Sequence, residues 1–143
     1  MSLSVCDDAL SSLRLNMQYS IDKKEQYSIL TLQEEKLDSP LSPALKSEFV
    51  TLNAEGIKNI IIDLSEVKYV DSSGLSALLV GNRIYNEDGG IFILSTLNDH
   101  VLKLIKISQL NNVLNILPTV EEAIDAVFLK EIESDLQEGD DNE

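Results

Sequence analysis

Two short segments, each built around a continuous apolar run, constrain this chain more than any other feature. "NIIIDL" covers residues 59–64 and "IFILST" covers residues 91–96. A strand that alternates apolar and polar residues has one solvated face, whereas an uninterrupted apolar strand is covered on both faces, as in parallel sheets flanked by helices. Between the two runs, Leu75, Leu78 and Leu79 recur at helical spacing. The chain therefore predicts a strand, a crossover helix and a second strand.

Further strand and helix signals alternate on either side of this unit. "YSILTL" at residues 27–32 is the predicted first strand, and "NILP" at residues 115–118 is a weak last strand. Three more helices are indicated by their caps and stops, namely Ser42 before Pro43, Gly56 as a stop, Asn98 as a cap, and Thr119 with Glu122 in a capping box. We therefore expect one α/β domain over residues 17–130, with a mixed, partly parallel sheet and helices packed on it.

The two ends of the chain lack the features of a packed domain. Residues 1–16 show no sustained period, and we interpret them as disordered leader or added sequence. Residues 131–143 carry seven acidic side chains and no basic one, with too few apolar residues to offset the loss of chain entropy on folding. We predict a mobile acidic tail that aids solubility, and we favour this role over the alternative of a docking arm for a basic partner.

Charge and composition exclude several classes of partner and site. A formal net charge of −14 would repel nucleic acid and anionic membrane surfaces. No apolar stretch approaches the roughly 20 residues of a membrane span, and we find no signal peptide, so we expect a cytoplasmic protein. One cysteine, Cys6, and one histidine, His100, offer no metal-ligand cluster, and no Gly-Lys pair of a phosphate-binding loop occurs. We expect neither metal nor cofactor, and the oligomeric state is left open.

"YVDSSGLSALL", residues 69–79, places small polar residues where a strand gives way to a helix. Open α/β sheets usually bind their ligands at such turns. Ser72 and Ser73 stand at the helix N-terminus, where free backbone N–H groups favour a hydroxyl oxygen or a phosphate, and Gly74 lets a partner approach the backbone. The alternative is that one serine only caps the helix while Asp71 closes the turn, which is worth about 1 kcal/mol. Local chemistry alone favours this alternative.

The order of these segments resembles the STAS domain family of anti-sigma factor antagonists. The similarity rests on "NIIIDLSEVKYVDSSGLSALL", the preceding "LDSPLSPALKSEF" and the later "GGIFILST" and "TVEEAIDAV", and it extends over residues 19–128. In that family, the serine directly after the motif aspartate is phosphorylated by a partner kinase that is also an anti-sigma factor. The resemblance implies that Ser72 is the phosphoacceptor of this chain.

The resemblance also implies how the domain works. The unphosphorylated domain would bind the kinase through Asp71, Ser72, Ser73 and Gly74, and it would be released on phosphorylation, with ATP and its metal supplied by the kinase. Ser73 is then expected to cap the helix, and Asp71 to shape the turn or to contact the partner's metal. Ser76 departs from the pattern, because many relatives have glycine there. The alternative is a STAS-type scaffold or sensor that binds partners or a small ligand without a phosphate switch.

A hydrolytic enzyme is the alternative from a different class, because a serine on a strand-to-helix turn is also typical of the hydrolase nucleophile elbow. "DSSGL" lacks the glycine two places before the serine. A Ser-His-acid system would have to use His100, which we expect at a surface helix start beside Asn98 and Asp99. We therefore predict that the chain is no enzyme and that it is the substrate of a kinase.

Overall fold

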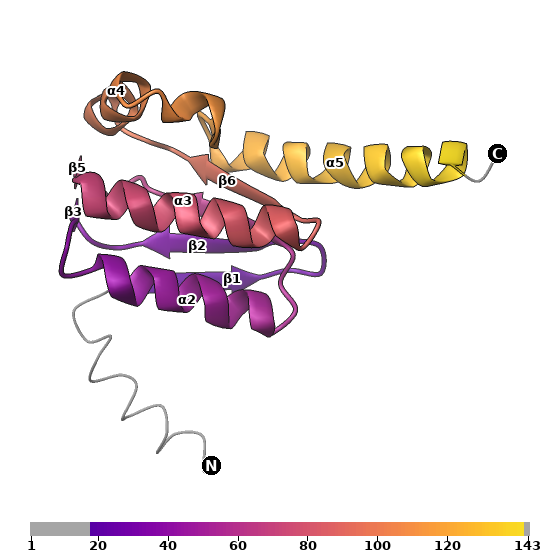
Figure 1. The fold of residues 1–143 in the computed structure, drawn as a ribbon, viewed down its shortest axis with the longest axis horizontal. Helices are drawn as coiled ribbons and strands as arrows, with labels where there is room; N and C mark the ends of the chain where they lie inside the picture. The colour runs from indigo at the N-terminus through magenta and orange to yellow at the C-terminus, as the bar shows by residue number, and fades with distance from the viewer. Residues whose placement is uncertain (1–17, 142–143) are drawn as a thin grey trace, which may run out of the picture.

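Strands and helices alternate along the chain in a computed structural model that describes residues 18–141, with side chains to Glu133 (Figure 1). The elements are β1 (Tyr19–Lys23), β2 (Ser28–Leu32), β3 (Lys36–Leu37), α2 (Ser42–Ala54), β4 (Asn59–Asp63), β5 (Tyr69–Val70), α3 (Ser72–Glu87), β6 (Ile91–Ser95), α4 (Asp99–Ile107), the 3-10 turn η1 (Leu110–Asn112), β7 (Asn115–Leu117) and α5 (Val120–Asp141). Five strands form a sheet in the order β1-β2-β4-β6-β7. β1 is antiparallel to β2 and the other neighbours are parallel, so the predicted mixed, partly parallel sheet is confirmed.

The two uninterrupted apolar runs form the centre of this sheet. β4 lies between β2 and β6, and its residues Ile60, Ile61 and Ile62 are completely buried. Phe92 and Ile93 of the neighbouring β6 are buried as well. Successive strand residues point to opposite faces, so burial of every residue requires cover on both faces. That requirement explains why these segments contain no alternating polar residues.

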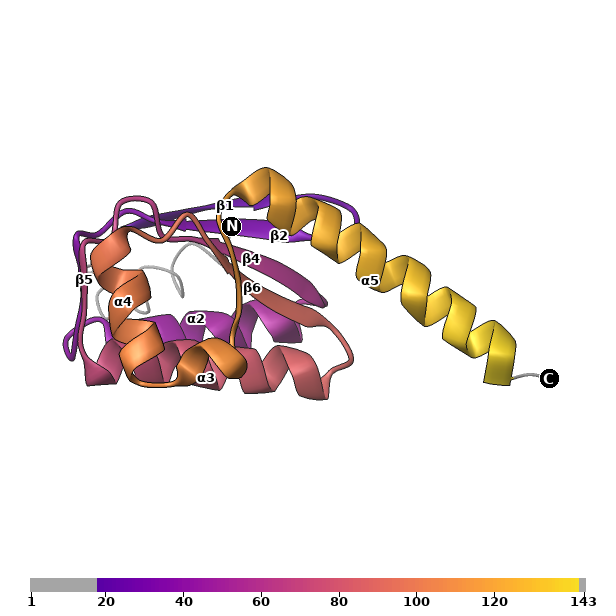
Figure 2. The same cartoon turned by 90° about the horizontal axis from the view of Figure 1, so that it is seen from above.

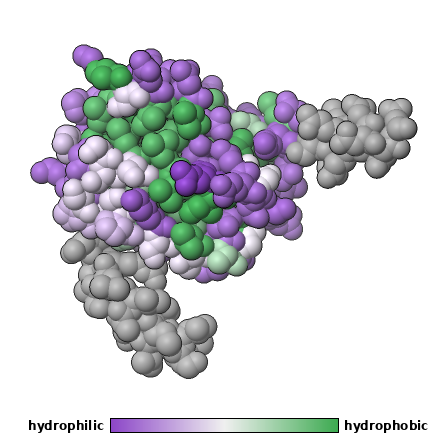
Figure 3. All heavy atoms as spheres, in the orientation of Figure 1, coloured by the Kyte–Doolittle hydropathy of each residue, from purple (hydrophilic) through white to green (hydrophobic). Residues whose placement is uncertain are grey.

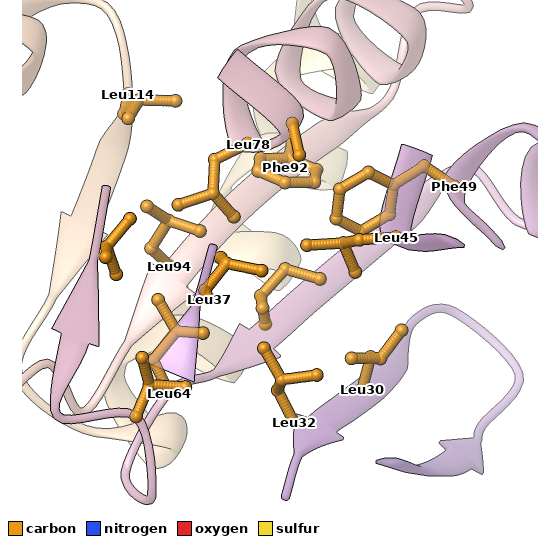
Figure 4. Packing of buried hydrophobic residues seen from close by; sticks show 14 of the residues in the cluster. Leu30, Leu32, Leu37, Leu45, Phe49, Leu64, Leu78, Phe92, Leu94 and Leu114 are labelled. Atoms are coloured by element: carbon orange, nitrogen blue, oxygen red, sulfur yellow. The ribbon is translucent and has the colours of Figure 1, made fainter. Parts of the chain in front are cut away.

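Helices α2 and α3 cover one face of the sheet, which we call the thick face (Figure 2). Its core is built from leucines, isoleucines and valines, with the rings of Phe49 and Phe92 packed edge to face (Figure 4). The ring centroid of Phe92 lies 5.2 Å from that of Phe49 and 5.9 Å from that of Tyr85. The Tyr85 hydroxyl donates a hydrogen bond to the Phe49 carbonyl at 3.2 Å, and burial raises the pKa of Tyr85 above its ordinary value. This hydroxyl therefore remains a neutral donor inside the core.

The opposite face of the sheet, which we call the thin face, is covered by the first turns of α5 alone among the described helices (Figure 2). Its core is a cluster of five buried residues, Ile61, Ile91, Ile93, Ala123 and Val127. The predicted cap of this helix is confirmed, because the Thr119 hydroxyl accepts a hydrogen bond from the Glu122 amide at 3.1 Å. The cap and the two buried helical residues fix the start of α5 against the sheet.

Three predictions about the elements need correction. The first strand is β1 rather than residues 27–32, and its sequence signal is weak because only Tyr19 and Ile21 are half-buried at this sheet edge. The N-cap of α2 is Leu41, because the predicted cap, Ser42, is buried and uses its hydroxyl elsewhere. By contrast, the cap predicted at Asn98 needs no correction. Its side-chain oxygen accepts a hydrogen bond of 2.8 Å from the Val101 amide, which confirms the prediction.

The third correction concerns the acidic tail predicted to be disordered over residues 131–143. α5 continues through these residues to Asp141. A helix is costly to begin and inexpensive to extend, and glutamate, leucine and glutamine are favourable helix residues. The cap and the packing at the start of α5 therefore allow the helix to continue through residues whose acidic composition alone does not predict a helix. The predicted leader, residues 1–16, lies outside the described residues.

Candidate functional site: a serine cluster at the start of α3

A small parallel sheet positions the "DSSGL" turn. β3 pairs with β5, with Lys36 opposite Tyr69 and Leu37 opposite Val70. The pairing continues into the turn, where the Asp71 amide donates a hydrogen bond to the Leu37 carbonyl at 3.1 Å. The loop that leads into α2 is thereby held beside the N-terminus of α3. Residues more than thirty positions apart in the sequence thus form one site.

Asp71 is the N-cap of α3. Its backbone is extended, with φ −98° and ψ −174°, and its Oδ1 atom accepts a hydrogen bond from the Gly74 amide at 2.9 Å. A carboxylate at this position satisfies a free helix amide and lies at the positive end of the helix dipole. The expectation that Ser73 caps the helix is therefore wrong. Ser73 lies within the first helical turn, and Asp71 fulfils the expectation that it shapes the turn.

The two serines of the motif have different surroundings. Ser72 is exposed, and its hydroxyl makes no hydrogen bond with any described residue. Ser73 is half-buried, and its hydroxyl lies 3.3 Å from the hydroxyl of Ser39. The carbonyl of Ser73 also accepts a hydrogen bond from the Ser42 hydroxyl at 2.8 Å. Ser73 thus joins α3 to the start of α2, whereas the Ser72 hydroxyl is hydrogen-bonded to no described residue.

Gly74 has a different role from the predicted one of opening the backbone to a partner. It is buried, and a Cβ atom at this position would lie 2.4 Å from the Leu37 carbonyl oxygen and 2.8 Å from a Val70 methyl carbon. Both contacts are closer than real Cβ atoms tolerate. The glycine therefore allows α3 to lie against the β3–β5 pair, and it faces the interior of the protein.

An open hollow of about 330 Å³ lies beside Ser72 between α2 and α3. It is lined by Ser39, Ser42, Pro43, Lys46, Ser72, Ser73 and Ser76. Lys46, on α2, is the cationic residue of this lining and makes no ion pair with any described residue. Hydroxyl groups, a free ammonium group and a helix N-terminus together suit an anionic group. The "DSSGL" motif did not point to Ser39, Ser42 and Lys46, because they come from the turn before α2 and from α2 itself.

Other kinds of site receive no support from the described residues. His100 is exposed on the first turn of α4, and the Ser72 hydroxyl is not hydrogen-bonded to it. Within the part of the chain that the structure describes, no three His, Cys, Asp or Glu side chains gather where they could hold a metal ion. No helix in this part is both long and apolar enough to cross a membrane.

Comparison with known proteins relates this arrangement to a family. The sequence model of the STAS domain matches residues 18–123. A candidate anti-sigma factor antagonist from Thermotoga neapolitana is 29% identical over 73 residues, which are 51% of this chain and 65% of that protein. The matched segment therefore spans slightly less than two thirds of this relative.

Solved structures agree on the fold. An anti-sigma factor antagonist from Mycobacterium paratuberculosis has a TM-score of 0.69 at 22% identity, over 78% of this chain and 93% of that one. The phosphorylated form of the Bacillus cell fate determinant SpoIIAA has a TM-score of 0.60 at 23% identity, over 77% and 99%.

A murine anion transporter, solute carrier 26 family member A9, has a TM-score of 0.65 at 17% identity, over 76% of this chain and 18% of the transporter. The same fold thus occurs in proteins with different activities, and these structural likenesses describe the fold alone. The match of the domain model over most of the chain goes further. This chain belongs to the STAS domain family.

Proposed function

We propose that this chain is an anti-sigma factor antagonist that binds an anti-sigma factor kinase while unphosphorylated and is released when Ser72 carries a phosphate. One observation carries the proposal, namely the contrast between the two serines. Ser72 is exposed and its hydroxyl is free of hydrogen bonds to described residues, whereas Ser73 is half-buried beside Ser39. A kinase must reach the acceptor hydroxyl and reorient it, and Ser72 meets both requirements.

The chemistry of the transfer assigns few tasks to this chain. The Ser72 Oγ atom forms a bond to the γ-phosphorus of ATP, the bond between that phosphorus and the bridging oxygen breaks, and ADP leaves. The hydroxyl proton passes to a base of the kinase, which also holds the ATP and its metal. The chain presents the hydroxyl on a rigid helix end whose cap, Asp71, is bonded to the Gly74 amide. The N-terminus of α3 and the Lys46 ammonium group favour the phosphate that results.

Phosphorylation would act on the complex more than on the fold. A phosphoserine adds about −1.5 to −2 charge units at neutral pH, beside the Asp71 carboxylate. A partner packed closely over Ser72 would have to accommodate added bulk, desolvation and repulsion from any facing carboxylate. A loss of about 3 kcal/mol weakens binding roughly a hundredfold. The structure of SpoIIAA in a phosphorylated form supports this proposal, because a protein of similar fold carries a phosphate in that structure.

Incubation of the chain with its anti-sigma factor kinase and ATP, followed by mass spectrometric mapping, tests the assignment. Phosphate is expected on Ser72, and Ser72→Ala should abolish labelling and bind the kinase constitutively. Ser72→Asp should bind roughly a hundredfold more weakly with an almost unchanged melting midpoint. Ser73→Ala is the matched control and should still be labelled. Phosphate on Ser73, or undiminished affinity after full phosphorylation of Ser72, would refute the mechanism.

A STAS-type sensor without a phosphate switch is the second candidate, and a specific hollow favours it. A pocket of about 480 Å³ lies at the carboxyl ends of β6 and β7, which is a usual place for ligands in open α/β sheets. It is lined mainly by apolar side chains, with Leu97, Asp99, Leu102, Lys106, Asn111, Ile116, Leu117 and Pro118. Apolar side chains also gather on the surface between α4 and α3 (Figure 3). Kinase binding that requires a small ligand and is unchanged by Ser72→Ala and Ser72→Asp would favour this alternative.

A further inference from the structure

α5 continues well past the segment that matches the STAS domain. The STAS match ends at residue 123, whereas α5 runs from Val120 to Asp141. Figures 1 and 2 show that its first turns lie on the sheet and that the rest extends past the edge of the domain as a single helix. The eighteen residues beyond the match would form a rod of about 27 Å at 1.5 Å per residue. Most of α5 thus lies outside the matched segment.

The contacts of α5 with the sheet end near Glu131. Ala123 and Val127 are completely buried on the sheet. One turn later, the Asn59 side-chain nitrogen donates hydrogen bonds to the Glu131 carboxylate at 3.1 Å and to the Gln26 carbonyl at 2.8 Å. The two following residues whose side chains are described, Ile132 and Glu133, are both exposed. The helix thus leaves the domain immediately after Glu131.

Three large apolar side chains are exposed where the helix leaves. Phe128, Leu129 and Ile132 are 40%, 60% and 55% exposed. At 3.6 residues per turn they occupy an arc of about 100°, and this arc is turned away from Ala123 and Val127. Phe128 touches the domain at one edge, with its ring centroid 6.0 Å from that of Tyr27. We call these three residues the outer stripe; they form a contiguous apolar surface that no described residue covers completely.

The charge around the outer stripe indicates what would cover it. Glu131 and Glu133 flank it, Lys130 lies on the other side of the helix, toward the side of Ala123, and residues 131–143 contain seven acidic residues and no basic one. A second copy of this chain would bring two such acidic helices together on proteins of net charge −14, which opposes self-association. A surface with apolar side chains flanked by lysine or arginine would complement both the stripe and the charge.

We propose that α5 beyond residue 127 is a docking arm for a basic protein partner. The partner surface that covers the outer stripe has apolar side chains such as leucine, flanked by lysines or arginines. The arm starts beside Asn59, at the amino end of β4, whereas Ser72 follows the carboxyl end of the same strand through β5. The two sites therefore lie toward opposite ends of the sheet. Docking on α5 is independent of the proposed function at Ser72 and leaves that serine accessible.

The probe for a test is a synthetic amphipathic helix with leucines spaced three and four residues apart and lysines elsewhere, labelled for fluorescence anisotropy. The full chain should bind it at an ionic strength of about 0.15 M, where unspecific attraction is largely screened. Leu129→Gln combined with Ile132→Gln should weaken binding at least tenfold. The matched control, Ile107→Gln with Val113→Gln, replaces two residues that are 69% and 53% exposed and should leave the affinity unchanged. Ser72→Asp should also leave it unchanged.

Affinity that neither double variant lowers would refute the proposal, because the peptide would then respond only to the overall negative charge. An equal loss in both would also refute it, because the peptide would then respond to exposed apolar side chains wherever they lie. Analytical ultracentrifugation of the unmodified chain decides the remaining case: a dimer that disappears in the Leu129→Gln, Ile132→Gln variant would identify a second copy as the occupant and overturn the proposal. Circular dichroism with melting of both variants establishes that each remains folded, and a large stability loss at Leu129 and Ile132 would contradict their placement outside the core.

Discussion

The two faces of the sheet differ in how much structure they carry. The thick face packs α2 and α3 around a large core that includes Phe49, Phe92 and Tyr85, and the proposed phosphoacceptor stands at one end of it. The thin face packs five buried residues under the first turns of one helix. The elements of the thick face lie within the STAS match, while most of α5 lies beyond it. The helices of the thick face thus belong to the matched domain, whereas most of the helix on the thin face lies outside it.

This difference shows that side chains are exposed for different reasons on the two faces. On the thick face, Ser72 is exposed on an element that is otherwise fixed by many buried neighbours, so its freedom is local. On the thin face, Leu129 and Ile132 are exposed because they lie on the side of α5 that is turned away from Ala123 and Val127. The first arrangement presents a rigid chemical group, and the second presents an apolar surface that a partner can cover.

The largest expected effect tests the comparison directly. Phe92→Ala removes a completely buried ring that contacts both Phe49 and Tyr85, and it should lower the free energy of unfolding by about 3–5 kcal/mol. Val127→Ala on the thin face removes two carbons from a smaller cluster and should cost about 1–2 kcal/mol. Urea titration followed by circular dichroism measures both. Equal losses would show that the two faces contribute alike and would break the comparison.

Much of this two-faced architecture could be predicted from the sequence, because its signals are local. The runs at residues 59–64 and 91–96 specify strands covered on both faces by their lack of polar alternation. Asn98 and Thr119 cap the helices that follow them, since a cap depends on a few neighbouring residues. β1 escaped prediction because an edge strand with two half-buried residues has little pattern to detect.

The site was harder to predict because it depends on distant residues and on backbone geometry. Ser72 was found through a resemblance and its place after a strand, but the choice among Asp71, Ser72 and Ser73 as the cap is decided by the extended backbone of Asp71. The β3–β5 pair, two residues in each strand, brings Ser39 beside Ser73, and no local pattern announces it. The course of α5 was mispredicted because composition indicates whether residues can form a core and says little about extending an existing helix.

A smaller effect sharpens the comparison at the end of the thick face. Asp71→Ala removes the carboxylate that accepts the Gly74 amide hydrogen bond, and it should lower the free energy of unfolding by about 1 kcal/mol. Ser73→Ala removes one long contact with the Ser39 hydroxyl near the surface and should cost less than about 0.5 kcal/mol. Thermal melting of the two variants beside the unmodified protein provides the measurement. A larger loss of unfolding free energy for Ser73→Ala than for Asp71→Ala would indicate that Ser73 caps the helix.

The smallest expected effect locates the boundary between fold and arm within α5. Truncation after Glu133 keeps the Glu131 contact with Asn59 and the outer stripe, and it removes five acidic residues. Because the deleted turns lie past the sheet, the free energy of unfolding should change by less than about 0.5 kcal/mol, against the larger cost of Val127→Ala only two turns earlier. Lower self-repulsion should also make the melting midpoint less dependent on salt. The comparison requires urea titration and melting at two salt concentrations. A loss comparable to that of Val127→Ala would place the end of α5 in the cooperative fold, and the division of this helix into a packed start and a free arm would then be wrong.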